Sequence, residues 1–464
     1  MKRPDSIADR RDQYGRILGN SPEMYRTVHM LPCPRDAVEL AATHVWAPAL
    51  GAFTEWVLQK ALGAGVRRLY FLARDGYFPF QAARILCERR HLPLECRYLS
   101  CSRYSVRLPL FHLNREAALA YVCRSGIAVT PDRILRRAGL TQEEREAVWQ
   151  RLQLPISPDA VLPYAGLPEI RRRLRGCQLF CDYMDRHSRA ALPGLAGYMR
   201  QEGLLDDVQD ALVDSGWVGS MQQTLGQLLR RLGRVRPLSG YYWGLYELPA
   251  GAPRRAYHGY AFGPEGPLHR KVYFNNNLFE AVFSAPHGMT VSYRQEGERY
   301  VPVYEEIGQG RREWNERLEG LLLPYIRRLA ERQGALRAEE ALSRDRETVC
   351  RLLRVLMCTP TDAEAAAFGV LPFSDDVLER GDRPIAAPLS RRELRAHHPL
   401  PKLLSLALSR DGGARESAWF EGSAVLQGGA VRRHLRQYTL YKYLLHARKQ
   451  LRYRRIREGE FRNG

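Results

Sequence analysis

Two short segments of the sequence combine an apolar run with an acidic residue and a glycine. The first, Leu69–Tyr77, reads LYFLARDGY, and the second, Ala211–Met221, reads ALVDSGWVGSM. Each apolar run is too short for a buried helix and leads into a helix-like segment. The pattern predicts a strand, a tight turn and the start of a helix at both places, with Asp75 and Asp214 at the strand ends.

A glycine-rich turn that leads into a helix is suited to binding phosphate, because the first N–H groups of a helix lack partners and carry partial positive charge. If both turns belong to one parallel sheet, they meet at the carboxyl edge of its strands, where α/β folds bind ligands. For either turn alone, an ordinary connection without a ligand is the alternative. The pair, with Arg74 and Ser220 in place, favours a phosphorylated ligand.

The two segments resemble loops of type I phosphoribosyltransferases. Val213–Ser220 resembles the phosphoribosyl-diphosphate loop of that family, in which apolar residues precede acidic residues and a turn rich in Gly, Thr and Ser. Leu72–Gly76 resembles its diphosphate loop. The family usually has two adjacent acidic residues, whereas Ser215 follows Asp214 here, and the turn is slightly shorter.

A longer set of motifs is more specific. It comprises Phe71–Phe78, Ser102–Arg103, Val213–Gln222 and Phe279–Gly288. Together they resemble bacterial polysaccharide-locus proteins that are often labelled haloacid-dehalogenase-type hydrolases, a label that belongs to a phosphatase domain frequently fused to this module. The module itself resembles glycan phosphoribosyltransferases, which place ribofuranose 5-phosphate on a growing surface glycan such as O-antigen or capsule. The resemblance covers roughly residues 36 to 305.

The resemblance implies phosphoribosyl diphosphate (PRPP) as donor, a glycan acceptor carried by a lipid, and Mg²⁺ as cofactor. Asp214 would hold the ribose hydroxyls directly or through Mg²⁺. Arg74 and Arg103 would meet the diphosphate, since guanidinium matches phosphate geometry. Backbone N–H groups and a hydroxyl of the second loop would cradle the 5-phosphate. The other donor-binding candidates are Gly76, Ser215, Gly216, Trp217, Gly219 and Ser220.

A sugar hydroxyl is a poor nucleophile, so that transfer to a glycan profits from a general base. Asp75 and Glu280 are the candidates, with His287 third. Glu280 can also be interpreted as a helix-cap carboxylate, and His287 as a turn histidine bonded to backbone. Trp217 can either stack on a sugar or pack against the body.

Two other enzyme classes remain as alternatives. A haloacid-dehalogenase-like phosphatase needs a strand that ends in Asp-x-Asp, and neither Asp75 nor Asp214 has that neighbour. The product is therefore expected to keep its 5-phosphate and to need a separate phosphatase. A nucleotide-sugar glycosyltransferase lacks support from a Gly-x-Gly-x-x-Gly or Asp-x-Asp motif, and no nucleic-acid reader motif is found.

Composition sets the class of protein. A chain of 464 residues, 45% hydrophobic and 26% charged, is typical of a globular protein with two or three units. Without an apolar stretch of membrane-spanning length or an apolar signal core, a cytoplasmic location is expected. The net charge of +20 implies an anionic partner: nucleic acid, an anionic lipid surface or a phosphorylated ligand.

Hydrophobic periodicity predicts an α/β protein with a parallel sheet, and the resemblance implies that its core is of the type I phosphoribosyltransferase kind. Strands are expected at 66–72 and 95–99, in a segment that ends at Asp214, and at 238–245, and residues 271–274 are expected to be extended. A small hairpin is predicted for residues 293–304.

The chain is expected to divide into an N-terminal arm, an α/β core with a helical insertion, and a mainly helical C-terminal domain. Their ranges are residues 1–35, 36–305 with the insertion at about 109–205, and 306–464. An insertion of this size can form a cap that holds the acceptor, or a brace without a ligand.

The last segment, Val431–Arg457, mixes leucines and tyrosines with many arginines. Such a helix can lie on the inner membrane with its basic groups toward anionic headgroups, where a lipid-linked acceptor is found. The alternative is a solvated basic face whose apolar side packs on the body.

Overall fold

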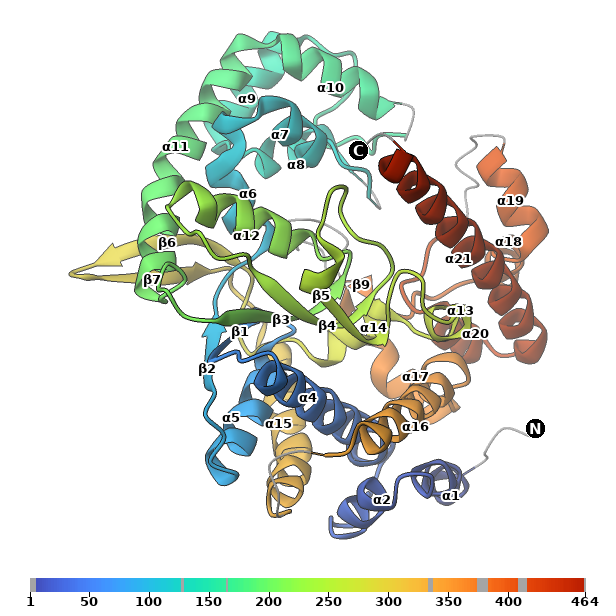
Figure 1. Ribbon diagram of the computed structural model, residues 1–464. Helices are drawn as coiled ribbons and strands as arrows, with labels where there is room; N and C mark the ends of the chain where they lie inside the picture. Colours follow the sequence, from blue (N-terminus) through green and yellow to red (C-terminus); the bar gives the residue numbers. More distant parts are fainter. Residues whose placement is uncertain are drawn as a thin grey trace.

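The computed structural model describes residues 6–126, 129–163, 166–332, 337–373, 383–407 and 415–462. Its centre is a five-stranded sheet with the order β2-β1-β3-β4-β5 (Figure 1). All neighbouring strands are parallel, which confirms the α/β class with a parallel sheet. The strands are β1 (Arg68–Leu72), β2 (Glu95–Leu99), β3 (Asp210–Trp217), β4 (Ser239–Leu245) and β5 (Tyr257–Phe262).

Helices cover both faces of the sheet. In β1, Leu69 and Phe71 belong to one hydrophobic cluster and Tyr70 and Leu72 to another, because successive side chains of a strand point to opposite faces. All four are buried, as expected of a parallel sheet covered on both sides. The first face packs against α4 (Ala47–Gly63), α5 (Tyr77–Arg89), α15 (Gln309–Ala330) and α16 (Glu339–Cys358), and the second against α11 (Gln178–Gln201) and α12 (Ser220–Arg231).

Residues 6–35 belong to the segment that is expected to form an N-terminal arm lying on the body. They form α1 (Ile7–Leu18) and α2 (Pro22–His29), and Tyr14 of α1 is fully buried in the main hydrophobic cluster. Buried Arg10 forms an ion pair of 2.6 Å with Glu364 of α17 (Asp362–Gly369). The segment is thus packed into the body together with C-terminal helices.

The helical insertion builds a small core of its own, and its helical character is confirmed. The predicted hairpin is also present as β6 (Thr290–Glu296) and β7 (Arg299–Tyr304), and it packs against α11. Between β2 and α11 the described helices are α6 (Arg103–Arg107), which precedes the insertion, and then η2 (Leu108–Leu113), α7 (Arg115–Val122), α8 (Pro131–Arg137), α9 (Gln142–Leu152) and α10 (Leu167–Gly176).

Two local predictions were wrong, and one strand was missed. β3 does not end at Asp214 but pairs with β4 as far as Trp217, so that the turn comes later. Lys271 lies in a helix, α13 (Leu268–Val272), where its buried Nζ donates to the carbonyl of Pro264. β5 was not predicted, because His258 and Gly259 interrupt its apolar pattern.

The C-terminal region is largely helical, as predicted. Its last helix, α21 (Val431–Arg462), contacts α13, α19 (Pro399–Ala407) and α20 (Phe420–Gln427) (Figure 1). A small hydrophobic cluster that includes Leu394, Phe420 and Leu435 joins α18 (Arg391–Ala396), α20 and α21. In the part of the chain that the structure describes, no helix has the length and apolarity needed to cross a membrane.

Candidate functional site

A cavity of about 1800 Å³ lies at the carboxyl edge of the sheet. In the strand order β2-β1-β3, the strand that follows β1 in sequence lies on one side of it and β3 lies on the other side. The loops after β1 and β3 therefore diverge. Such a switch point leaves a crevice, which is where α/β proteins bind ligands. The two segments singled out in the sequence meet there, since Arg74, Asp75, Asp214, Ser215 and Ser220 all line the cavity.

The turn after β1 brings Arg74 and Asp75 to the cavity. The peptide bond between Ala73 and Arg74 is cis. Gly76 is not among the described lining residues, and its N–H donates to the carbonyl of Leu72 at 2.9 Å. A Cβ atom at Gly76 would lie 2.5 Å from the same carbonyl oxygen. Gly76 therefore allows α5 to begin close against β1, which is a role in the turn and not at the ligand.

The end of β3 and the turn after it need glycines for their backbone. Gly216 has φ +104°, and a Cβ there would lie 2.7 Å from the ring of Tyr242. Gly219 caps α12 with φ +69° and is also outside the described lining. Ser220, the first residue of α12, does line the cavity. The amino end of this helix, with its partial positive charge, therefore borders the cavity.

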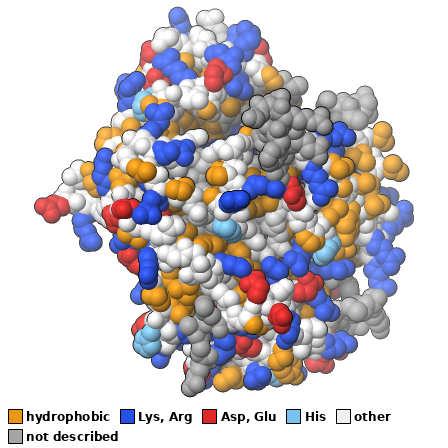
Figure 2. All heavy atoms as spheres, in the orientation of Figure 1, with side chains coloured by type: hydrophobic (Ala, Val, Ile, Leu, Met, Phe, Trp, Pro, Cys, Tyr) orange, Lys and Arg blue, Asp and Glu red, His pale blue; other side chains and the backbone are white. Residues whose placement is uncertain are grey.

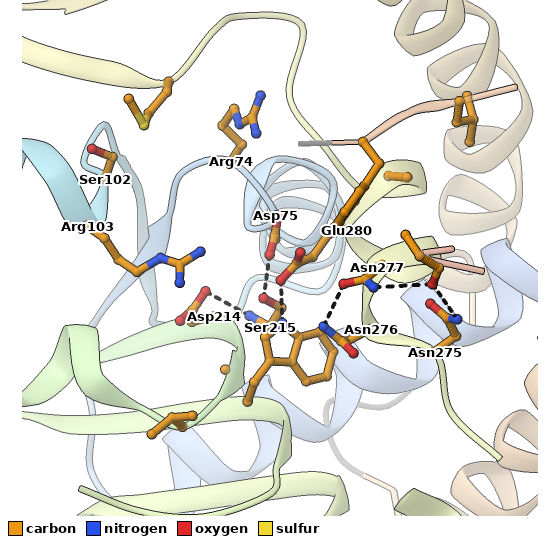
Figure 3. Close-up of a pocket in the computed structure, with 18 of the residues that line it drawn as sticks. Arg74, Asp75, Ser102, Arg103, Asp214, Ser215, Asn275, Asn276, Asn277 and Glu280 are labelled. Carbon is orange, nitrogen blue, oxygen red and sulfur yellow. Dashed lines mark hydrogen bonds between the residues drawn. The ribbon is translucent and has the colours of Figure 1, made fainter. Parts of the chain in front are cut away.

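Asp75, Asp214 and Glu280 gather at the floor of the cavity (Figure 3). The hydroxyl of Ser215 donates to the carboxylate of Asp75, and its backbone N–H donates to Asp214 Oδ1 at 2.9 Å. The indole N–H of Trp217 donates to Glu280. Ser215 and Trp217, both in the last part of β3, therefore hold two of the carboxylates in place.

The carboxylates raise one another's proton affinity. Burial, and next the negative charge of Asp75, raise the pKa of Asp214 to about 7. The same two causes raise the pKa of Glu280 to about 8, although Arg103 opposes the rise at both residues. Such groups hold a proton near neutral pH and can also release it, which is what acid–base catalysis requires.

Arg103 and Arg74 occupy different parts of the cavity wall. Arg103 begins α6 directly after its cap, Ser102, and its side chain is exposed to the cavity. In Figure 3, Arg103 points toward Asp214, whereas the guanidinium of Arg74 is turned away from Asp75. The structure therefore brings Arg103, more than Arg74, to the carboxylates.

Further arginines of α6 and the insertion line the same cavity, namely Arg107, Arg124 and Arg137. The guanidinium of Arg107 lies 4.7 Å from the ring centre of Tyr121. Burial lowers the pKa of Arg107, and the charges of Arg103 and Arg124 lower it further. Because these like charges oppose one another, an anion bound among them would be stabilised.

His287 does not take part in this cluster. Its Nδ1 lies 2.8 Å from the carbonyl oxygen of Gly288, and its Nε2 lies 2.8 Å from the hydroxyl of Tyr98. Since a carbonyl only accepts, Nδ1 carries the proton and Nε2 accepts from Tyr98. Burial lowers the pKa of His287, and it is absent from the described lining. This geometry supports a turn histidine rather than a catalytic one.

Several lining residues were missed in the sequence. Asn276 and Asn277 line the cavity on the same helix as Glu280, α14 (Asn276–Val282). The spacing of Asn276 and Glu280, four residues apart, is a signal that could have been used. Lys442 and Glu421 also line the cavity, and only tertiary packing brings them there.

In the part of the chain that the structure describes, no group of three or more His, Cys, Asp or Glu side chains is arranged to hold a metal ion. Asp214 and Asp75 nevertheless offer the oxygen donors that Mg²⁺ prefers, and this ion commonly takes its remaining ligands from substrate phosphates and water. The carboxylates thus fit a Mg²⁺ ion that arrives with a phosphorylated ligand.

No protein-family model matches the chain, and no curated protein matches it significantly. The function must therefore be inferred from the site itself. Its main features are acid–base groups on one side, arginines on the other, and space for more than one substrate.

Proposed function

We propose that the protein is a glycan phosphoribosyltransferase with a core of the type I phosphoribosyltransferase kind. It transfers ribofuranose 5-phosphate from PRPP to a glycan hydroxyl and releases diphosphate. One observation carries the proposal: a cluster of carboxylates with raised pKa values faces a group of arginines at the switch point of a parallel sheet. The arginines suit diphosphate, and the carboxylates suit sugar hydroxyls and proton transfer.

In this reaction the bond between the anomeric carbon and a diphosphate oxygen breaks, and the electron pair leaves with the diphosphate. The acceptor oxygen forms the new bond to the anomeric carbon, and its proton passes to Glu280, with Asp75 as the alternative base. Asp214 holds the ribose hydroxyls. Arg103, Arg107 and the arginines beside them stabilise the negative charge that the departing diphosphate gains.

Mg²⁺ would supply positive charge to the diphosphate while it is bound. Asp214 is the carboxylate proposed to hold it, because this residue lines the cavity from β3 together with Asp75. The ribosylated product keeps its 5-phosphate, and a separate phosphatase would remove it.

Donor binding provides the first test. Calorimetry with PRPP and Mg²⁺ should show binding that Asp214→Asn weakens by about 10- to 100-fold, as expected for loss of a charged hydrogen-bond acceptor. Ser220→Ala should weaken it by about two- to tenfold. Gln223→Ala, on the same helix but outside the described lining, is the control and should bind the donor normally.

If Asp214→Asn and Ser220→Ala both bind PRPP as well as the wild-type protein does, the assignment of residues 213–220 as the donor-binding loop is wrong. Binding of a nucleotide sugar in place of PRPP would favour the glycosyltransferase alternative. Release of inorganic phosphate from glycans that carry ribose 5-phosphate, lost on Asp75→Asn, would favour the phosphatase.

A lipid-linked acceptor requires that the enzyme reach a membrane surface. The outer side of the C-terminal region exposes leucines, and Figure 2 shows hydrophobic side chains gathered there, at the right, beside Lys and Arg. We name this group the leucine patch; its members on α19 and α21 are Leu400, Leu403, Leu404, Leu440, Leu444 and Leu451. Exposed arginines on α18 and α21 include Arg391, Arg392, Arg395, Arg433, Arg436 and Arg448.

The leucine patch predicts binding to an anionic bilayer. Vesicles of phosphatidylglycerol and phosphatidylethanolamine should sediment the protein at low salt, and about 0.5 M salt should release it by screening. The double variant Leu440→Gln/Leu444→Gln should bind at least about tenfold more weakly, because it removes apolar surface from the contact.

Val235→Gln is the matched control for this experiment, since Val235 is 93% exposed but lies in the loop between α12 and β4. Equal sedimentation of the double variant and the control, or no sedimentation of the wild-type protein, would rule out the leucine patch as a membrane contact.

A further inference from the structure

The inner face of α21 forms one wall of the cavity. Residues spaced by three and four positions share a face of a helix, and the lining residues of α21 follow this spacing. They are Tyr438, Tyr441, Lys442, Leu445, His446, Lys449 and Gln450. The leucines of α21 that belong to the leucine patch lie on the opposite side of this helix, so that α21 separates the cavity from the outer surface.

Opposite this wall, α14 presents amide groups next to the candidate base. Asn276 Nδ2 donates to Asn277 Oδ1 at 3.0 Å, and Asn277 Nδ2 donates to the carbonyl of Ala418 at 3.2 Å (Figure 3). Glu280 follows Asn276 by one helical turn, so that both face the cavity. The amides are therefore held in place beside the carboxylate.

The buried pair of Glu421 and Lys442 also lines this part of the cavity. Lys442 Nζ donates to Glu421 Oε1 at 2.6 Å, and both side chains are at least nine-tenths buried. Glu421 Oε2 is buried and has no hydrogen-bond partner among the described residues. A buried carboxylate oxygen without a donor is costly, and a ligand hydroxyl would supply that donor.

The two sides of the cavity differ in charge. The side formed by α6 and the insertion carries Arg103, Arg107 and Arg124, which favour an anion. On the α21 side, Glu421 neutralises Lys442, and the buried ammonium of Lys271 donates to the carbonyl of Pro264. Exposed Lys449 and half-buried His446 also line this side, together with amides and aromatic rings. Amides, a carboxylate and aromatic faces are the groups that recognise a neutral ring bearing several hydroxyls.

We propose that the space between α14 and α21 is the acceptor subsite and that it binds a neutral sugar unit of the glycan. The role as acceptor rests on the proposed function. A sugar bound there has one hydroxyl at Glu280 and the rest of its ring between Asn276 and Tyr441. The acceptor therefore enters from the C-terminal helices, and the helical insertion serves the diphosphate.

Methyl glycosides of glucose, galactose, mannose, rhamnose and N-acetylglucosamine are suitable probes. Saturation-transfer NMR at about 10 mM detects binding in the millimolar range. At least one glycoside should bind the wild-type protein, and Asn276→Ala and Tyr441→Ala should each raise its dissociation constant by about three- to tenfold. Gln437→Ala is the control, because Gln437 lies on α21 outside the described lining and should leave binding unchanged.

Melting temperatures of the variants show whether they remain folded, and calorimetry shows whether they still bind PRPP. If no glycoside binds, or if both site variants bind as well as the control, the acceptor subsite is wrong while donor binding can still stand. If glycosides bind as expected but PRPP does not, the sugar subsite stands and the phosphoribosyltransferase proposal fails.

Discussion

Glu280→Gln is expected to lower turnover by about two to four orders of magnitude, which is the usual contribution of a general base. Glutamine has nearly the same shape and keeps an oxygen that can accept the indole N–H of Trp217. Donor affinity and melting temperature should therefore change little. Steady-state transfer assays, together with calorimetry for PRPP, separate this loss of chemistry from a loss of binding.

The pH dependence gives an independent check on the same residue. Burial and Asp75 raise the pKa of Glu280 to about 8, and only the ionised carboxylate can take a proton from the acceptor. Turnover of the wild-type enzyme should therefore fall about tenfold per pH unit as the pH drops below that value. The residual activity of Glu280→Gln should lack this dependence.

Asp75 is the alternative candidate for the general base. If Asp75→Asn removes the pH dependence and Glu280→Gln keeps normal turnover, then Asp75 is the base and Glu280 only supports Trp217. A fall in melting temperature that matches the loss of activity in Glu280→Gln would favour a structural role for this carboxylate.

The two turns at the sheet edge could be predicted because their signals are local. An apolar run of strand length, followed by an acidic residue and glycine, indicates a βα turn without knowledge of the rest of the chain. The order of the strands then brings Asp75 and Asp214 together. The exact end of β3 could not be predicted, because Ser215 and Gly216 stay in the strand only through pairing with β4.

Other features depend on tertiary packing. The packing of α1 into the main core through Tyr14 could not be predicted, because most residues around Tyr14 are polar. Lys442 comes from a helix that looks like a basic surface segment, yet it is buried beside Glu421. Histidine is a residue type that suits acid–base catalysis. Only the folded positions of Tyr98 and Gly288 show that both ring nitrogens of His287 are engaged in hydrogen bonds.

Arg103→Ala is expected to lower kcat/KM by about 100- to 1000-fold, which is typical for loss of a group that stabilises charge developing in the transition state. Arg103 is exposed to the cavity at the start of α6 and points toward Asp214 (Figure 3). The diphosphate gains charge as the anomeric bond breaks, so that kcat should fall more than donor affinity. Arg103→Lys should recover only part of the loss, because an ammonium lacks the forked pair of N–H groups that matches phosphate oxygens.

Arg84→Ala is the control, since Arg84 is an exposed arginine of α5 outside the described lining. This variant should retain full activity. A normal kcat/KM for Arg103→Ala, with Arg74→Ala inactive, would transfer this role to Arg74 and place the diphosphate on the β1 side of the cavity.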